Sequence, residues 1–557
     1  MRLKGARYIA ESLKEHGLTH IFYMESILTR TLVEAEKLGI TRVLAHSEKA
    51  AAYMADGYAR AARRPGVCMA QSVGAANLAA GLQDAYWAHS PVISFTGSKP
   101  ALFQYRNAYQ EMIHNPLFDH LTKYNVKVEV LEQLPFLLPQ AFREATTGAP
   151  RPVHLDLQGL AGEFIEEAEG DIEVIQDPVH RRYPARRPIP EPEDIKQCAR
   201  MLMASEKPVL VVGRGAIISE AASEVVELAE RLSVPVATSS DGKAVMPDVH
   251  PLFLGPTGSY GRPCANIVVA EADLVFFIGT GTGDQVTRDW TSPDPATCII
   301  QLDIDPSEVG RNYPGAIGLV GDAKRTLRGI LDCVGSVKSR RGTWAQRAKR
   351  EVQAWRRSVE ANRISDTIPI RPERLCQEIT RVLPKDGVLV TDTGYSAIWS
   401  GTMIDLVHPD QEYFRAAGSL GWSLPAALGV KCAMPSRPVI CFCGDGAFWY
   451  HLSELETASR LQKNLVVVVN NNGVMAQCAP FVHQAYGEQV GRREDLYRYG
   501  ETDFAQLAAS VGCLGFRVER PDQIAEAIQS AMRQGRPAVV DVRTDGDVHP
   551  AWTVHSP

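Results

Sequence analysis

The sequence predicts an α/β protein with three doubly wound domains, each built on a parallel sheet. Three observations lead to this fold class. A chain of 557 residues is too long for one hydrophobic core, because domains average about 150 residues. Short apolar runs that end in glycine turns alternate with helical segments, as in parallel βαβ units. The apolar fraction of 45% and the charged fraction of 22% are typical of a globular protein.

Residues 1–165 are expected to form the first domain. It begins with a helix over residues 5–16, which Gly17 ends. A helix over 49–62 and a glycine turn at 72–77, which opens a further helix, lie between its apolar runs. The runs expected to be strands are 19–22, 41–45, 67–70, 91–97 and 152–157. This repetition indicates a mainly parallel sheet with helices on both faces.

Two further domains follow the first. Residues 166–190, rich in proline and arginine, are expected to be an extended linker. Residues 191–335 are predicted to be a Rossmann-like central domain, and 336–366 a basic linker helix. Residues 367–557 are expected to form the third domain. Its tail from Gly546 has no clear periodicity; a disordered or surface-packed end is expected, with a flap over the site as the alternative.

Composition excludes several functional classes. The net charge of −6 argues against a nucleic-acid binder, so the basic linker helix is interpreted as a solvated surface. The eleven cysteines include no CxxC pair, which indicates a reduced protein without structural zinc or a disulfide framework. No apolar run approaches the 18 residues of a membrane span, and the amino-terminal segment resembles an amphipathic helix rather than a signal peptide. A cytoplasmic location without membrane contact is expected.

Residues 439–474 read as a strand, a glycine turn, a helix and a second strand. The first strand ends at Asp445, between Gly444 and Gly446, and the second ends at Asn472. Ligands bind at the carboxyl ends of neighbouring parallel strands. Carboxylate and amide oxygens suit Mg²⁺ or Ca²⁺, and flanking glycines let backbone N–H groups approach a diphosphate.

The spacing of 27 residues from Asp445 to Asn472 resembles the thiamine diphosphate (ThDP) motif. The chain resembles the acetolactate synthase-like branch of ThDP enzymes over nearly its whole length and in the same domain order. This resemblance implies ThDP and Mg²⁺ as cofactors, a pyrimidine-binding first domain and a diphosphate-binding third domain. It implies Asp445, Asn472 and the carbonyl of Val474 as metal ligands. The implied cofactor-binding residues of this stretch are Gly444, Gly446 and Ala447.

The first domain carries the pattern that surrounds the catalytic glutamate of this family. Ser47-Glu48 is followed by MADGYAR at residues 54–60, and Glu48 precedes Gly57 by nine positions, as in the family. The resemblance implies that Glu48 hydrogen-bonds N1′ of the aminopyrimidine, so that the imino N4′ takes the proton of C2. A carboxyl group in an apolar crevice suits this role, because desolvation raises its pKa.

Other site residues are implied by the same resemblance. Gly74 and Asn77, in SVGAAN, resemble the turn beside the pyrimidine. Gln110, in YQEMIHNPLFDHLTKYNV, resembles a catalytic glutamine that faces the reacting centre, and His114 nearby is expected to be a surface histidine.

The third domain carries further residues that the resemblance implies. Gly394, Tyr395 and Ser396 resemble the turn that contacts the diphosphate. Leu420 resembles the bulky residue that bends ThDP, and Gly418 near it is a further implied cofactor-binding residue.

The central domain resembles the nucleotide-carrying domain of the family. Its matching segments are GRGA at 213–216, GTGTGD at 279–284, and Asp303 with Asp305. FAD, ADP, CoA and no ligand at all remain open. Because the glutamate and the metal site lie on different domains, the family builds each active site between two chains, which implies a homodimer or a homotetramer.

The substrate remains open between alternatives. Acetolactate synthases carry a glycine-rich turn where this chain has residues 22–26, and a tryptophan shortly after the position of Asn472, which is lacking here. NNNGV at 470–474 is closer to 2-hydroxyacyl-CoA lyases and oxalyl-CoA decarboxylases, yet Met475 replaces their tyrosine. The readings are a 2-oxo acid decarboxylase and carboligase, a lyase acting on an acyl-CoA, and a non-catalytic paralogue.

Overall fold

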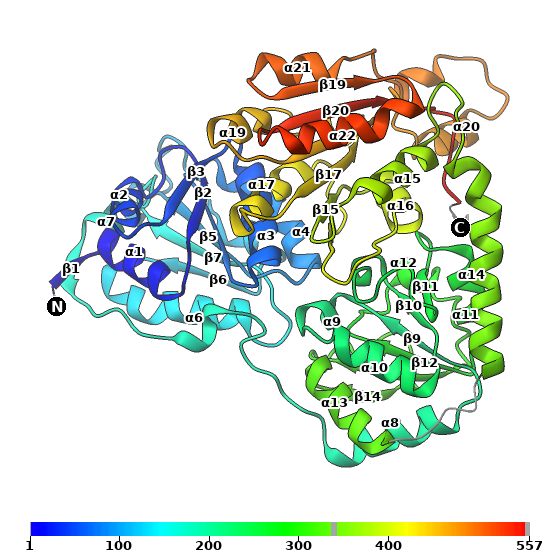
Figure 1. Cartoon of the computed structure of the whole chain (residues 1–557). Coiled ribbons are helices and arrows are strands. Elements are labelled where there is room, and N and C mark those ends of the chain that lie inside the picture. Colours follow the sequence, from blue (N-terminus) through cyan, green and yellow to red (C-terminus); the bar gives the residue numbers. More distant parts are fainter. Residues whose placement is uncertain (1, 336–341, 552–557) are drawn as a thin grey trace.

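The structure, a computed structural model, describes residues 2–335 and 342–551. Within these residues it contains three six-stranded sheets, each with all strands parallel and with flanking helices (Figure 1). The predicted α/β class with three doubly wound domains is confirmed. The start of the expected linker helix, 336–341, and the end of the tail, 552–557, lie outside the described residues.

The first sheet has the strand order β3-β2-β4-β5-β7-β6. Its strands are β2 (His20–Met24), β3 (Thr41–Leu44), β4 (Gly66–Ala70), β5 (Val92–Ser98), β6 (Tyr124–Val128) and β7 (Val153–Gln158). The main helices are α1 (Gly5–Glu15), α2 (Thr29–Lys37), α3 (Glu48–Ala62), α4 (Ala75–Trp87) and α6 (Leu134–Thr146), with short α5 (Asn115–Phe118) and α7 (Glu163–Glu167). Sequence analysis missed β6, whose residues are mostly half-buried and show no clear alternation.

The central sheet has the order β11-β10-β9-β12-β13-β14. Its strands are β9 (Pro208–Val212), β10 (Val236–Thr238), β11 (Phe253–Pro256), β12 (Leu274–Ile278), β13 (Cys298–Asp303) and β14 (Ile317–Val320). Its helices are α8 (Pro192–Ala204), α9 (Arg214–Ile218), α10 (Ala222–Leu232), α11 (Pro263–Ala270), α12 (Asp284–Thr287) and α13 (Ala323–Val334). In the segment before it, β8 (Glu169–Asp171) pairs antiparallel with β1 (Arg2–Lys4).

The third sheet has the order β16-β15-β17-β18-β20-β19. Its strands are β15 (Val388–Thr391), β16 (Glu412–Arg415), β17 (Val439–Gly444), β18 (Val466–Asn471), β19 (Leu514–Val518) and β20 (Ala538–Arg543). Its helices are α15 (Pro372–Val382), α16 (Tyr395–Met403), α17 (Ser423–Ala433), α18 (Asp445–Trp449), α19 (Glu454–Arg460), α20 (Ala479–Tyr486), α21 (Phe504–Ser510) and α22 (Ile524–Arg533). The long α14 (Gly342–Arg363) packs against both α11 and α15.

Helices α3 and α17 join the first and third domains, and they lie side by side in Figure 1. The two backbones approach closely at Gly57 and Gly429. A Cβ at Gly57 would overlap the carbonyl oxygen of Ala426, and a Cβ at Gly429 would overlap that of Met54. Glycine is therefore required at both positions for this helix packing.

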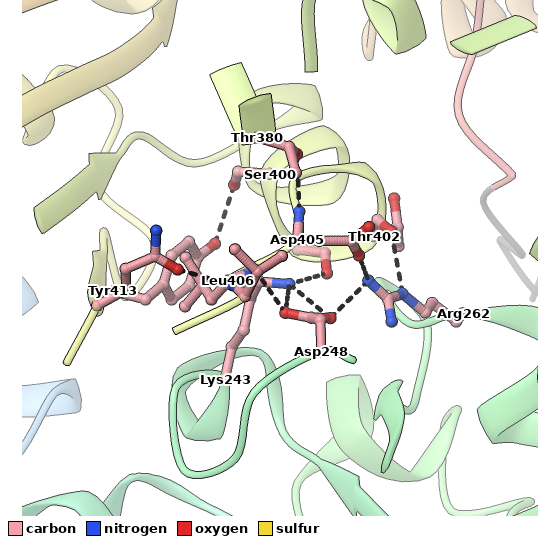
Figure 2. Close-up of polar contacts among 12 residues, drawn as sticks. Lys243, Asp248, Arg262, Thr380, Ser400, Thr402, Asp405, Leu406 and Tyr413 are labelled. Atoms are coloured by element: carbon pink, nitrogen blue, oxygen red, sulfur yellow. Dashed lines mark hydrogen bonds and ion pairs between the residues drawn. The ribbon is translucent and has the colours of Figure 1, made fainter. Parts of the chain in front are cut away.

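A buried charge cluster joins the central and third domains (Figure 2). Arg262 contacts Asp248 at 2.7 Å and Asp405 at 2.9 Å, and Lys243 contacts Asp248 at 3.2 Å. The Lys243 ammonium also donates to the carbonyl of Gly401, which lies in the last turn of α16. Removing one partner would leave a buried charge unpaired, at a cost of about 3–5 kcal/mol, so the cluster restrains how the two domains meet.

Among the described residues, no helix has the length and apolarity that a membrane crossing needs. The cysteines, all free, include three exposed ones, Cys298, Cys333 and Cys478.

Gly57→Ala should lower the free energy of unfolding by about 1–3 kcal/mol, because the new methyl group meets the backbone of α17. Urea unfolding followed by circular dichroism measures this loss. Gly329→Ala, also inside a helix, is the matched control, since its methyl group would lie 3.3 Å or more from side-chain atoms of Ile195 and meets no backbone. Equal effects of the two substitutions would contradict the close approach of α3 and α17.

Candidate active site

A cavity of about 420 Å³ opens at the carboxyl ends of β15, β17 and β18. The structure brings all the predicted third-domain residues together on its wall. They are Gly394, Tyr395, Ser396, Gly418, Leu420, Gly444, Asp445, Gly446, Ala447, Asn472 and Val474. They come from different βα connections of one sheet, which is where ligands bind in this fold.

Asp445 is held at the end of β17 by backbone donors. Its carboxylate accepts hydrogen bonds from the N–H of Gly446, at 2.8 Å, and from that of Gly473, at 2.6 Å. Burial raises the pKa of the Asp445 carboxyl to about 6. A cation beside this carboxylate would stabilise its charged form.

The atoms of Asp445 and Asn472 that could bind a metal ion are oxygens. The side-chain oxygen of Asn472 accepts from the N–H of Val474 at 3.1 Å, and both residues line the cavity. The described residues contain no group of three or more His, Cys, Asp or Glu side chains that could hold a metal. A carboxylate, an amide and backbone carbonyls fit Mg²⁺, which binds through few protein ligands together with phosphate oxygens.

Helix α16 begins at the same cavity. Gly394 precedes it with φ +66°, a conformation that glycine adopts without strain. Tyr395 and Ser396 form its first turn and line the cavity, so the amino terminus of this helix lies at the cavity wall. Such a terminus suits the negative charge of a diphosphate.

The predicted first-domain residues form a separate cluster. Glu48 is the first residue of α3, after Ser47, whose hydroxyl accepts from the N–H of Ala50. Asn77 donates to the Glu48 carboxylate at 3.1 Å. A Cβ at Gly74 would lie 2.5 Å from the same carboxylate, so the absence of a side chain there leaves room for Glu48.

Gln110 lies beside this cluster. Its backbone has φ +57°, and its carbonyl accepts from the hydroxyl of Ser72 at 2.7 Å. The side-chain amide donates to Tyr109, while its buried Oε1 has no hydrogen-bond partner within the described structure. The side-chain oxygen of Gln110 can therefore accept a further hydrogen bond.

Family models match three segments of the chain. They are the thiamine pyrophosphate enzyme N-terminal TPP binding domain at residues 3–120, the central domain at 195–330, and the C-terminal TPP binding domain at 392–542. The chain belongs to the thiamine pyrophosphate enzymes. Thiamine pyrophosphate is ThDP, and the implied cofactor therefore agrees with the family.

Relatives of this ThDP enzyme align with it from end to end. A probable acetolactate synthase large subunit of Methanocaldococcus jannaschii is 34% identical over 98% of this chain and 92% of the relative. An acetolactate synthase of Arthrospira platensis is 31% identical over 99% and 96%. The acetolactate synthase isozyme 3 large subunit of Escherichia coli is 28% identical over 98% and 96%. The resemblance to this branch is thus confirmed.

The two clusters of predicted site residues do not share a cavity within one chain. Glu48, Gly74, Asn77 and Gln110 are not among the residues that line the third-domain cavity. Both ends of α3 contact the third domain of the same chain: Arg60 donates to the carbonyl of Arg415, and Lys49 lies over the ring of Tyr450.

Sequence analysis missed part of the cavity wall of the ThDP enzyme. Tyr260, from the central domain, lines the cavity, and its hydroxyl accepts from the side chain of Gln477 at 2.8 Å. Met475 and Cys478 also line it, in the stretch where the sequence departs from acetolactate synthases. No local signal marks Tyr260, because its position depends on how the domains meet.

The position of His114 differs from the one predicted. It is 1% exposed and not a surface histidine. Its Nδ1 lies 2.9 Å from the Asp156 carboxylate and 3.1 Å from the Thr96 hydroxyl. These polar partners lie inside the sheet, on β5 and β7, and a polar buried cluster cannot be recognised from a histidine in an irregular stretch.

A second cavity, of about 340 Å³, lies between the first and central domains of the ThDP enzyme. The predicted turns contribute Gly215, Gly279 and Gly281, and Asp303 lines it at the end of β13. Burial raises the pKa of the Asp303 carboxyl to about 6. Asp305 does not line this cavity.

Gly444→Val should weaken ThDP binding at least about tenfold while leaving the Tm of the apoprotein within about 2 °C. Gly444 has φ −80°, ψ 162°, which valine adopts, and its Cβ would lie 3.5 Å from Ser396 Oγ on the cavity wall. Isothermal titration with ThDP and Mg²⁺ measures the change. Gly283→Val, which has nearly the same backbone angles before α12, should bind ThDP normally. Equal ThDP affinity of both variants would contradict this position for the cofactor.

Proposed function

We propose that this enzyme uses ThDP and Mg²⁺ to decarboxylate a 2-oxo acid and to join the remaining fragment to a second carbonyl compound. The aligned relatives, which are named acetolactate synthases, support this proposal. The observation that carries the proposal is one cavity lined by residues of the GDG segment (444–446), of the NNN segment (470–472) and of the start of α16. ThDP, when bound, supplies the stabilised carbanion that such chemistry needs.

In this proposal the third domain holds the diphosphate and its cation. The Asp445 carboxylate, the Asn472 amide oxygen and the carbonyl of Val474 bind Mg²⁺. The N–H groups at the start of α16 and the side chain of Ser396 bind phosphate oxygens. The raised pKa of Asp445 supports this assignment, because a cation compensates the cost of its buried charge.

The first domain holds the reacting end of the cofactor in the same proposal. Glu48 shares a proton with N1′ of the aminopyrimidine, and Asn77 fixes the orientation of its carboxylate. Gln110, whose Oε1 has no hydrogen-bond partner among the described residues, would face the substrate and accept a hydrogen bond from it.

We further propose that two chains build each site, as a homodimer or a homotetramer. The Glu48 cluster does not reach the cavity of its own chain. Large apolar side chains are exposed beside both halves: Tyr105, Tyr109 and Ile113 near Gln110, and Trp449 and Phe481 near the cavity. Exposed apolar surface of this kind marks protein interfaces. A second copy that brings the Glu48 cluster over the cavity would cover both surfaces.

The proposal includes two further points. The cavity of the central domain takes a nucleotide such as FAD, ADP or CoA, supported by its glycine turns and by the cations Arg151, Arg214 and Arg311 on its wall. The enzyme is cytoplasmic, supported by cysteines that are all free among the described residues.

The second candidate is a lyase that cleaves a 2-hydroxyacyl-CoA. The NNNGV sequence at 470–474 favours it. The names of the aligned relatives favour the synthase. A non-catalytic paralogue is disfavoured because the metal-binding and proton-holding side chains are all present.

The purified protein with ThDP and Mg²⁺ should release CO₂ from pyruvate and form acetolactate. Removal of the cation with EDTA should abolish this turnover, and added Mg²⁺ should restore it, because the diphosphate is held through the cation. Cleavage of a 2-hydroxyacyl-CoA thioester without reaction of pyruvate would establish the lyase instead. Inactivity on both substrates, with ThDP bound, would support the non-catalytic paralogue.

Glu48→Gln should lower kcat at least about 100-fold and leave the Kd of ThDP within about threefold, because glutamine keeps the shape but cannot hold the proton. Steady-state kinetics and isothermal titration give the two values. Glu36→Gln, at a carboxylate that pairs with Arg42 on the surface of the same domain, is the control. Unchanged kcat in Glu48→Gln would contradict the assigned role.

A further inference from the structure

The loop that carries Leu420 into the cavity is bound by a carboxylate of another domain. Three successive backbone N–H groups, of Ala417, Gly418 and Ser419, donate to Asp84 at 2.9, 3.2 and 3.0 Å. Asp84 lies on α4 in the first domain and is 1% exposed. A run of backbone donors around one carboxylate is a strong anion-binding arrangement.

Arg60 fixes the orientation of Asp84. Its guanidinium donates to Asp84 at 2.8 Å and to Asp56 through two nitrogens. A third nitrogen donates to the carbonyl of Arg415, where β16 ends. The indole of Trp422 donates to Asp56 at 2.8 Å and stacks on the guanidinium at 4.4 Å. Side chains of α3 and α4 therefore bind the loop at its start, its middle and its end.

A second carboxylate binds the other side of Leu420. Asp392 follows β15 and accepts from the N–H groups of Gly421, at 3.0 Å, and Ser423, at 2.8 Å. Asp392 is fully buried. Residues 417–419 are thus bound from the first domain and 421–423 from the third, and Leu420 stands between the two anchors.

We propose that Asp84 is a positioning residue of the cofactor site, which fixes the backbone of residues 417–419 so that Leu420 projects into the cavity. This inference rests on the proposed binding of ThDP in that cavity. Because the N–H of Gly418 donates to Asp84, it does not serve as a hydrogen-bond donor to the cofactor. The contact between the first and third domains then also sets the shape of the cofactor site.

The same two helices serve both halves of a ThDP site. Their amino-terminal ends carry Glu48, Gly74 and Asn77. Their carboxyl-terminal halves carry Arg60 and Asp84, which bind the loop of the third domain in the same chain. Contacts that only stabilise the protein could lie anywhere along the interface between the two domains. The contacts of Arg60 and Asp84 lie instead on the backbone around Gly418.

Asp84→Asn tests the inference, because the amide keeps the shape and loses the charge that three N–H groups and Arg60 share. We expect the Kd of ThDP to rise at least about tenfold at saturating Mg²⁺, since hydrogen bonds to a buried charge are weakened. Glu166→Gln is the matched control: Glu166 is 1% exposed and accepts a backbone N–H, of Thr31, but lies away from the cavity. It should lower Tm and leave the Kd unchanged.

A double-mutant cycle shows whether Asp84 acts through Leu420. The Kd of the double variant Asp84→Asn, Leu420→Ala should rise little above that of Leu420→Ala alone, because the position of an absent side chain no longer matters. Independent effects, with fold-changes that multiply, would overturn the inference. So would an unchanged Kd in Asp84→Asn.

A second variant and the unmodified chain complete the test. If Asp84→Asn yields no folded protein, Trp422→Phe removes the indole N–H donated to Asp56 and part of the ring stacked on Arg60, and an increase in Kd of about threefold or more is expected. No increase in that variant would overturn the inference. If the unmodified chain does not bind ThDP, the proposed function itself is contradicted, whereas normal binding there with an unchanged Kd in Asp84→Asn contradicts the inference alone.

Discussion

The close packing of α3 on α17 is the contact on which the geometry of this enzyme depends. Gly57 and Gly429 bring the two backbones together, and Arg60 and Asp84 bind the loop that follows β16. Glu48, at the amino end of the same helix, does not line the cavity of its own chain. In the proposed enzyme, a second chain therefore has to bring Glu48 to that cavity.

Two domains shape the third-domain cavity from opposite sides. The first domain binds the loop around Leu420, while the central domain binds the carboxyl end of α16 through Lys243 and Arg262 (Figure 2). Cations at that end of α16 complement its dipole, whose positive end faces the cavity. The central domain also supplies Tyr260 to the wall. The position of each element around this cavity therefore depends on how the domains meet.

Local patterns gave most of the fold and the third-domain half of the site. The GDG and NNN segments lie in one βαβ unit, so their spacing alone brings Asp445 near Asn472. The three-domain α/β architecture follows from apolar runs and glycine turns in the same way. Strand β6 was missed because its side chains are only partly buried. Asp84, Tyr260 and the buried His114 were missed because their partners lie in other domains or on distant strands, and no local pattern reports such contacts.

The central claim is that Glu48 of one chain serves the Asp445 cavity of another, and subunit complementation tests it most directly. Glu48→Gln and Asp445→Asn should each be nearly inactive. After the two variants are dissociated and mixed equally, half of the dimers are hybrids, and each hybrid holds one site with both groups intact, so about a quarter of the unmodified activity should return. If Glu48 and Asp445 acted within one chain, every hybrid site would lack one group. Absence of any recovered activity, in a mixture shown to contain hybrids, would contradict the account.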